Sequence, residues 1–244
     1  MTALYGVIGW NGRTFDARAR RAMSACLEPF GDEDGWVGDA GTLSAAVGCR
    51  GGDRTSAVAA RQRALGVVVF ADAHLSRRAG LAASLGIPAS STDTELIASA
   101  YDAWGADLTG RISGEFSAVI IDVRRGGVLL LRDHAGRRPL AMYEGDDMVA
   151  FASTALALTG APDVGHELDD ERAVELLVGA NATGRTFVRG VRTVPPGTTV
   201  RVDGGGTRQR RWWEGRFKVH DEGSIDAHAS KMREQFDRAV ACAV

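Results

Sequence analysis

Short apolar runs bounded by turn residues recur along this chain, and each predicts a strand. The runs cover residues 3–9, 43–47, 65–70, 116–123, 128–131, 198–202 and 207–213. Residues 65–70 are uninterruptedly apolar, so we expect that strand in the middle of a sheet. Turns that contain Gly join the run 116–123 to the run 128–131, and the run 198–202 to the run 207–213. This pattern predicts two hairpins. Residues 31–41 are rich in Gly and Asp and predict a loop.

Helical periodicity marks four other segments. In residues 14–27 one face gathers the apolar side chains, so Cys26 on that face is expected in the core. Residues 92–104 give the clearest helix, because Thr92 and Glu95 have the spacing of a capping box and Gly105 ends it. The patterns of residues 169–180 and 224–244 predict two more helices. Hairpins with helices between them indicate an α+β layered domain.

Composition excludes several classes of protein. The chain has 244 residues, 25% of them charged, and a net charge of −2, which gives no basic surface for nucleic acid. No apolar run approaches the roughly 18 residues of a membrane helix, and no signal peptide is visible, so we expect no membrane contact and a cytoplasmic location. Three cysteines without CxxC spacing argue against a disulfide framework and against a metal site.

The most distinctive stretch is 128–140, where an apolar run meets charged and turn-forming residues. Four apolar residues are followed by Arg132 and Asp133, and Gly136, Arg138 and Pro139 shape a tight reversal. A carboxylate at the end of such a strand needs compensation. We therefore expect Asp133 to be buried and paired with an arginine, Arg132 or Arg138, as a structural element.

This stretch also carries a resemblance to a known family. Residues 132–140 resemble the "RDxxGxxPLY" segment of the N-terminal glutamine amidotransferase domain in asparagine synthetase-type enzymes. The segments 112–122, 151–158 and 194–198 resemble that domain's "l-x-G-x-F-a-f-a-l-y-D", "fASe-x-k-a-L" and "vpPGh", in the same order. The resemblance implies the four-layer αββα sandwich of N-terminal-nucleophile (Ntn) hydrolases, with two antiparallel sheets.

The same resemblance implies a domain organisation. Residues 1–213 are expected to form the amidotransferase-like domain, 214–223 a linker, and 224–244 the first helix leading to an ATP-pyrophosphatase (synthetase) domain. The "SGGxDS" loop of that domain does not occur in these 244 residues. We therefore expect no cofactor in this chain, ATP and Mg in the synthetase domain, and that domain as the partner. The chain would be the front half of a larger enzyme, or a piece ending at the domain boundary.

The family's nucleophile is missing at the position that the resemblance suggests. Class II amidotransferases use an N-terminal Cys in "M-C-G-I-x-G", whose thiolate attacks the glutamine amide while its own α-amine serves as base. Matching residues 5–9 to this pattern puts Tyr5 at the nucleophile position. A phenol with a pKa near 10 and no adjacent α-amine is no substitute.

The rest of the glutamine pocket has changed in the same way. Ala71 and Asp72 stand where the family has the Asn and Gly of its oxyanion hole, and an acid there would repel the developing charge. Arg50 lies one place out of register with the arginine that binds the glutamine carboxylate. Asp93 matches the family's Asp for the glutamine α-amine, although helix capping is the favoured explanation of Asp93 taken alone. Together with Tyr5, these residues form a vestigial glutamine pocket without expected catalytic residues.

We therefore expect a glutaminase-deficient domain of an ATP-dependent amide-forming ligase, with a structural or substrate-docking role. A lasso peptide macrolactam cyclase and a β-lactam synthetase both fit, the former slightly favoured, because each captures the activated carboxylate with an amine of its own substrate. A peptide substrate or a leader-handling protein would then be a partner, and a homodimer remains open.

Other functions stay open. Removal of Met1 would give Thr2 a free α-amine, so an active Ntn amidohydrolase is one alternative. A glutamine-hydrolysing asparagine synthetase homologue is another. A non-catalytic module that docks a peptide or protein in the old glutamine cleft is the third.

Overall fold

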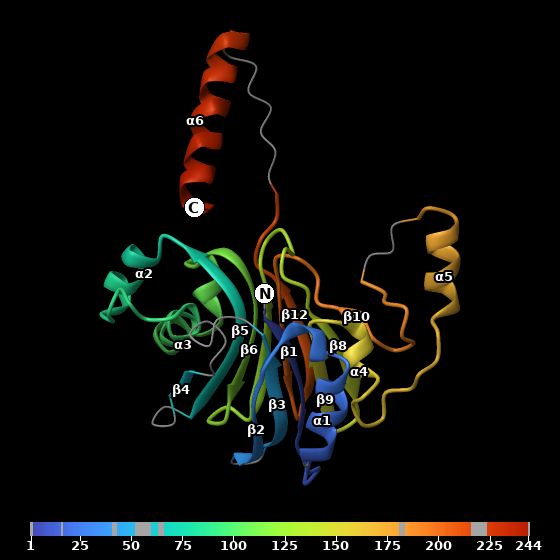
Figure 1. Cartoon of the computed structure of the whole chain (residues 1–244). Coiled ribbons are helices and arrows are strands. Elements are labelled where there is room, and N and C mark those ends of the chain that lie inside the picture. Colours follow the sequence, from blue (N-terminus) through green and yellow to red (C-terminus); the bar gives the residue numbers. More distant parts are fainter. Residues whose placement is uncertain are drawn as a thin grey trace.

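The computed structural model describes residues 2–15, 17–40, 43–51, 60–62, 66–180, 184–215 and 224–243. Two six-stranded sheets stand face to face, and all their strand pairs are antiparallel (Figure 1). Helices cover the outer face of each sheet. This is the four-layer αββα sandwich that the sequence predicts, so the predicted fold class is confirmed.

Sheet A has the strand order β10-β8-β9-β1-β3-β2. Its strands are Arg192–Thr193 (β10), Ala141–Gly145 (β8), Met148–Ala152 (β9), Ala3–Gly9 (β1), Leu43–Arg50 (β3) and Glu33–Ala40 (β2). The prediction of a loop over residues 31–41 was wrong. Strand β2 pairs with β3 along its whole length, and this pairing outweighs the low β-propensity of Gly and Asp.

Sheet B has the order β12-β11-β7-β6-β5-β4. Its strands are Gly206–Arg211 (β12), Thr198–Asp203 (β11), Gly127–Arg132 (β7), Ser113–Asp122 (β6), Val67–Ser76 (β5) and Ala60–Gln62 (β4). Pairs β6–β7 and β11–β12 are adjacent antiparallel strands, so both predicted hairpins are confirmed. Strand β5 lies inside the sheet, as its apolar run predicts.

The helices follow from local signals. On sheet A lie Ala17–Ala25 (α1) and Ala155–Leu158 (α4), and on sheet B lie Arg78–Leu85 (α2) and Asp93–Trp104 (α3). Short 3-10 turns cover Glu28–Phe30 (η1) and Gly105–Gly110 (η3), and the remaining helices are Asp170–Leu177 (α5) and Ile225–Ala243 (α6). Helix α3 begins at the predicted capping box, in which Thr92 and Glu95 bond each other's main chain.

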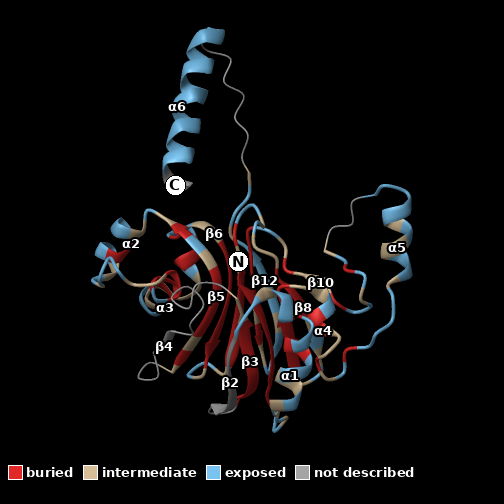
Figure 2. Ribbon diagram, in the orientation of Figure 1, coloured by how far each residue is buried: buried red, intermediate tan, exposed pale blue. Residues whose placement is uncertain are grey.

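Three apolar clusters hold the layers together (Figure 2). Because side chains alternate along a strand, β1 sends Leu4 and Ile8 between the sheets, and Ala3, Tyr5 and Val7 against α1 and α4. The cluster between the sheets also contains Phe70, Val119, Leu130 and Val200 of sheet B. This alternation decides which residues can reach the space between the sheets.

Helix α1 presents a narrower apolar face than its sequence predicts. Met23 is buried on α1 and Leu27 just after it, but Cys26 is exposed, so the prediction of a core thiol at Cys26 was wrong. The helix ends at Ala25, so Cys26 follows the last helical turn and no longer shares the helical face. Cys49, at the end of β3, is buried.

Helix α6 displays its apolar residues to solvent. Ile225, Met232, Phe236 and Val240 are all exposed, as Figure 2 shows for the whole helix. Residues 216–223 of the predicted linker lie outside the described residues. None of the helices in the described ranges combines the length and the apolar character that crossing a membrane requires.

Candidate functional site

Polar residues of sheet B line one end of the space between the sheets. On the inner face, Phe70 and Val119 belong to the apolar cluster. Two residues further along the same strands, Asp72 lies opposite Ser117, and Ser117 lies opposite Arg132. Residues opposite each other share a face, so these three form a polar row next to the apolar core. Both Asp72 and Ser117 are buried, and among the residues that the structure describes the Ser117 hydroxyl has no hydrogen-bond partner.

The N-terminus meets this row at Asp72. The Thr2 amide N–H donates to Asp72 Oδ1 over 3.2 Å, and Thr2 itself is buried. On the other side, Arg138 Nη1 lies 3.5 Å from Asp72 Oδ2, and Arg138 Nη2 lies 3.4 Å from Glu115. Thr2 and Asp72, two residues from opposite sheets, are thus brought into direct contact.

Tyr5 lies elsewhere. It is fully buried in the cluster between sheet A and α1, on the face of β1 opposite to Leu4. The structure therefore places Tyr5 on the face of β1 that points away from the space between the sheets. A different match would have found the contacting residue: aligning the last Gly of "M-C-G-I-x-G" with Gly6 instead of Gly9 puts Thr2 at the Cys position.

Burial disfavours the charged form of the Asp72 carboxyl group. Desolvation raises the pKa of Asp72 above its ordinary value, and the Thr2 hydrogen bond and the Arg138 charge oppose this only in part. The folded state therefore binds the Asp72 proton more tightly than the unfolded state. The charged carboxylate costs stability at neutral pH.

We expect this cost to appear as a pH dependence. Between the ordinary carboxyl pKa and the raised pKa of Asp72, the folded state holds more protons, so its contribution to the free energy of unfolding falls as pH rises. The side chain introduced by Asp72→Asn cannot titrate. The free energy of unfolding of this variant, minus that of the wild type, should therefore increase with pH across this window and then level off. Urea unfolding at several pH values measures it, with exposed Asp146→Asn as control. A difference that stays constant or falls would contradict this assignment.

The other predicted pocket residues are engaged elsewhere. Ala71 is buried on the helix-facing side of β5, away from the polar row. Arg50 donates to Ser24 Oγ at 2.6 Å and to the Gly31 carbonyl at 2.8 Å, which ties the end of β3 to the segment around α1.

Asp93 is neither free nor the cap of its helix. The capping residue of α3 is Thr92, and Asp93 follows it as the first helical residue. The carboxylate of Asp93 accepts the Leu75 N–H at 3.0 Å and lies 2.8 Å from Arg78 Nε. An ammonium group that binds Asp93 would share the carboxylate with Arg78 and the Leu75 N–H.

Asp133 is buried as predicted, but the predicted arginine pairing was wrong. Its carboxylate accepts hydrogen bonds of 2.9–3.3 Å from main-chain N–H groups, namely those of Phe116, Ala135, Arg137 and Arg138. The turn folds back over the carboxylate, so main-chain donors two to five residues away reach it before a long side chain does. Asp133 therefore organises the turn as a multiple acceptor.

Arg132 serves the same turn through its donors. Its guanidinium donates to the carbonyls of Gly136 (2.8 Å), Arg138 (3.0 Å) and Val194 (2.7 Å). Burial lowers the pKa of Arg132, and the charge of Asp133 opposes this shift. At Gly136, where φ is +66°, an added Cβ would lie 2.8 Å from the Pro196 ring. The Arg-Asp-x-x-Gly pattern is thus explained by the turn's own geometry, as predicted for a structural element.

Within the described ranges, no group of three or more His, Cys, Asp or Glu side chains is placed to hold a metal ion. The group of Thr2 that meets Asp72 is the main-chain N–H, and the carboxylate it meets is an anionic acceptor instead of an oxyanion donor.

Sequence comparison identifies a protein family that matches more than half of this chain. The family described as "Glutamine amidotransferase domain" matches residues 72–213, more than half of the chain. Asparagine synthetase [glutamine-hydrolyzing] 3 of Bacillus subtilis (strain 168) is 24% identical over 151 residues, which are 61% of this chain and 24% of the relative. Asparagine synthetase [glutamine-hydrolyzing] of Zea mays is 29% identical over 150 residues, 61% of this chain and 21% of the relative. The chain thus spans about a quarter of these relatives.

Solved structures share the fold. Glutamine phosphoribosylpyrophosphate amidotransferase from B. subtilis, complexed with ADP and GMP, superposes with a TM-score of 0.61 at 17% identity, covering 87% of this chain and 50% of that chain. A structure described as the allosteric regulatory enzyme of purine biosynthesis gives 0.58 at 16% identity, covering 87% and 49%. At this identity the likeness concerns the Ntn-type fold alone.

Proposed function

Because this chain belongs to the glutamine amidotransferase domain family and is related to asparagine synthetase N-terminal domains, we propose that it is a glutaminase-deficient domain of an ATP-dependent amide-forming ligase. The observation that carries the proposal is the buried Asp72 carboxylate, 3.2 Å from the Thr2 nitrogen. Glutamine hydrolysis by an N-terminal nucleophile needs a neutral amine as base and hydrogen-bond donors for the oxyanion. Asp72 works against both requirements.

The effect on the base follows from charge. If Met1 were removed, the Thr2 nitrogen would become an α-amine beside Asp72, and the adjacent carboxylate would favour its protonated form. A protonated amine cannot accept the proton of the Thr2 hydroxyl. The effect on the oxyanion is repulsion, since Asp72 offers an anionic acceptor where a donor is required.

Glutamine recognition is weakened at a second point. In the family that this sequence resembles, the acid at the position of Asp93 binds the substrate α-amine. Here Arg78 already occupies that carboxylate at 2.8 Å. A glutamine ammonium group would have to compete with Arg78 for this carboxylate.

The finer type within the proposal is a lasso peptide macrolactam cyclase or a β-lactam synthetase. In both, the substrate supplies the attacking amine, so ammonia from glutamine is unnecessary and its pocket is free to change. ATP and Mg would act in a synthetase domain that follows α6. The exposed apolar residues of α6 offer a surface on which that domain could pack. A peptide substrate or leader-handling protein, and a homodimer, remain further candidate partners.

One observation favours a second candidate, an Ntn amidohydrolase that uses Thr2. Thr2 is buried just before β1 and donates its N–H to Asp72, which pairs with Arg138, and it matches the family's Cys when Gly6 is aligned. Only an activity measurement separates this candidate from the proposal.

We expect the purified chain to release no ammonia from glutamine above the buffer rate. The coupled ammonia assay should give the same background for the wild type, Thr2→Ala and Asp72→Asn. N-terminal sequencing establishes whether Met1 is present. Ammonia release that Thr2→Ala abolishes would refute the proposal and establish the hydrolase, or a glutamine-hydrolysing synthetase domain.

A further inference from the structure

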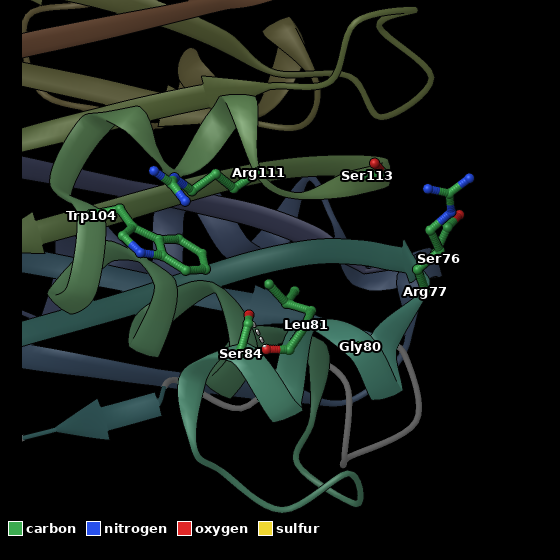
Figure 3. A pocket seen from close by; sticks show the side chains of 8 residues that line it. All are labelled: Ser76, Arg77, Gly80, Leu81, Ser84, Trp104, Arg111 and Ser113. Carbon is green, nitrogen blue, oxygen red and sulfur yellow. Dashed lines mark hydrogen bonds between the residues drawn. The ribbon is translucent and has the colours of Figure 1, made fainter.

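A trough on the surface of sheet B lies beside α2, outside the site described above. It has a volume of about 360 Å³ and is formed by the end of β5, helix α2, the end of α3 and the start of β6 (Figure 3). Its lining residues are Ser76, Arg77, Gly80, Leu81, Ser84, Trp104, Arg111 and Ser113. Two guanidinium groups and three hydroxyls thus line it, and no lining residue is a carboxylate.

The two arginines of the trough lack acidic partners, unlike their neighbours. Arg78 pairs with Asp93, and Arg210 pairs with Asp107 at 2.8 Å. Among the residues that the structure describes, neither Arg77 nor Arg111 forms an ion pair with a carboxylate. Two uncompensated charges beside one cavity create a positive potential that favours an anion.

The guanidinium of Arg111 is held in place by an aromatic ring. Its central carbon lies 4.9 Å from the ring centroid of Trp104. Stacking orients the planar group and leaves its charge and its N–H edges available, and a planar guanidinium binds carboxylates or phosphates through two parallel hydrogen bonds.

The main chain at Arg77 is held in an uncommon conformation. Arg77 is the residue before α2, with φ at +56°, and it supplies no side-chain hydrogen bond to cap the helix. Gly80, in the first turn of α2, lines the trough together with Arg77.

Figure 3 places the two cations at opposite ends of the trough. The Arg111 guanidinium lies near Trp104, while Arg77 lies at the other end, beyond Ser76, with Leu81 between them. We propose that the trough binds a small organic dianion, with one anionic group at each arginine and an apolar spacer on Leu81. This site is independent of the glutamine pocket and of the proposed ligase function.

The test is titration of the purified chain with glutarate, a dicarboxylate, and with 2-phosphoglycolate, which joins a phosphate to a carboxylate. Two-dimensional amide NMR gives the affinity and locates the site, and butyrate is the monoanionic control. We expect saturable binding of at least one dianion, with shifts in residues 76–81 and 111–113, and weaker binding of butyrate. The dianion that binds more tightly shows whether the second anionic group is a carboxylate or a phosphate.

Variants connect binding to the two arginines. Arg77→Asn keeps a residue that tolerates the left-handed conformation, and Arg111→Gln keeps polarity without charge. Each should weaken the dianion about fivefold, as expected for a solvent-exposed, charge-assisted contact, while Arg210→Gln, which removes an exposed arginine elsewhere on sheet B, should leave the affinity unchanged. Unchanged affinity in Arg77→Asn or Arg111→Gln, equal affinity for butyrate, or no saturable binding of either dianion would overturn the proposal.

Discussion

Asp133→Ala should lower the free energy of unfolding by about 3–5 kcal/mol, a large share of the 5–15 kcal/mol that a domain usually has. The substitution removes a fully buried acceptor from four main-chain N–H groups. Each buried donor left unpaired costs about 1–3 kcal/mol, although the donors of the turn recover part of this from water. The Phe116 N–H, inside sheet B, has the least access to such a replacement.

Urea or thermal unfolding measures this change, with Asp146→Ala as a matched control. Asp146 is an exposed aspartate in the turn between β8 and β9, so its removal should change stability by less than about 0.5 kcal/mol. Asp133→Asn should be intermediate, because one oxygen still accepts hydrogen bonds while the new amide donors oppose N–H groups. A folded Asp133→Ala protein with an unchanged melting temperature would show that this residue is not a structural acceptor.

Gly114→Ala should be the second severe substitution, costing about 2–4 kcal/mol. Gly114 is the second residue of β6, pairs with Leu75 of β5, and has φ at +134°, a conformation that residues with a Cβ rarely adopt. An added Cβ would lie 2.3 Å from the His74 carbonyl oxygen and 2.8 Å from the Leu75 Cα. Both atoms belong to the main chain of β5, so the clash can be relieved only by separating two strands of sheet B.

The melting temperature of Gly114→Ala, compared with that of Gly110→Ala, tests this expectation. Gly110 lies four residues earlier, and a Cβ there would meet no atom within 4 Å. Gly110→Ala should therefore leave stability nearly unchanged. If both variants have the same melting temperature as the wild type, β5 and β6 tolerate the displacement and the steric argument fails. If only Gly114→Ala is unstable, the Gly of the "l-x-G-x-F" segment is explained by strand contact and not by chemistry.

The sequence by itself determined the features that depend on neighbouring residues. The capping box at Thr92 and Glu95 starts α3 where predicted, because both of its hydrogen bonds form within one turn. The hairpins follow from apolar runs joined by turns that contain Gly. The order of the family segments determined the αββα architecture. Burial of Asp133 also followed from its place at the end of an apolar strand.

Only the tertiary structure decided which groups meet across the layers. A shift of three residues in the match for β1 exchanges Tyr5 for Thr2, and strand alternation places them on opposite faces, so register alone determines which one meets Asp72. Strand β2 exists because β3 offers a pairing edge, which composition cannot reveal. Asp133 binds main-chain donors because a folded turn concentrates several N–H groups around one point. Such choices depend on distances between segments remote in sequence, or on the path of a turn, and residue type specifies neither.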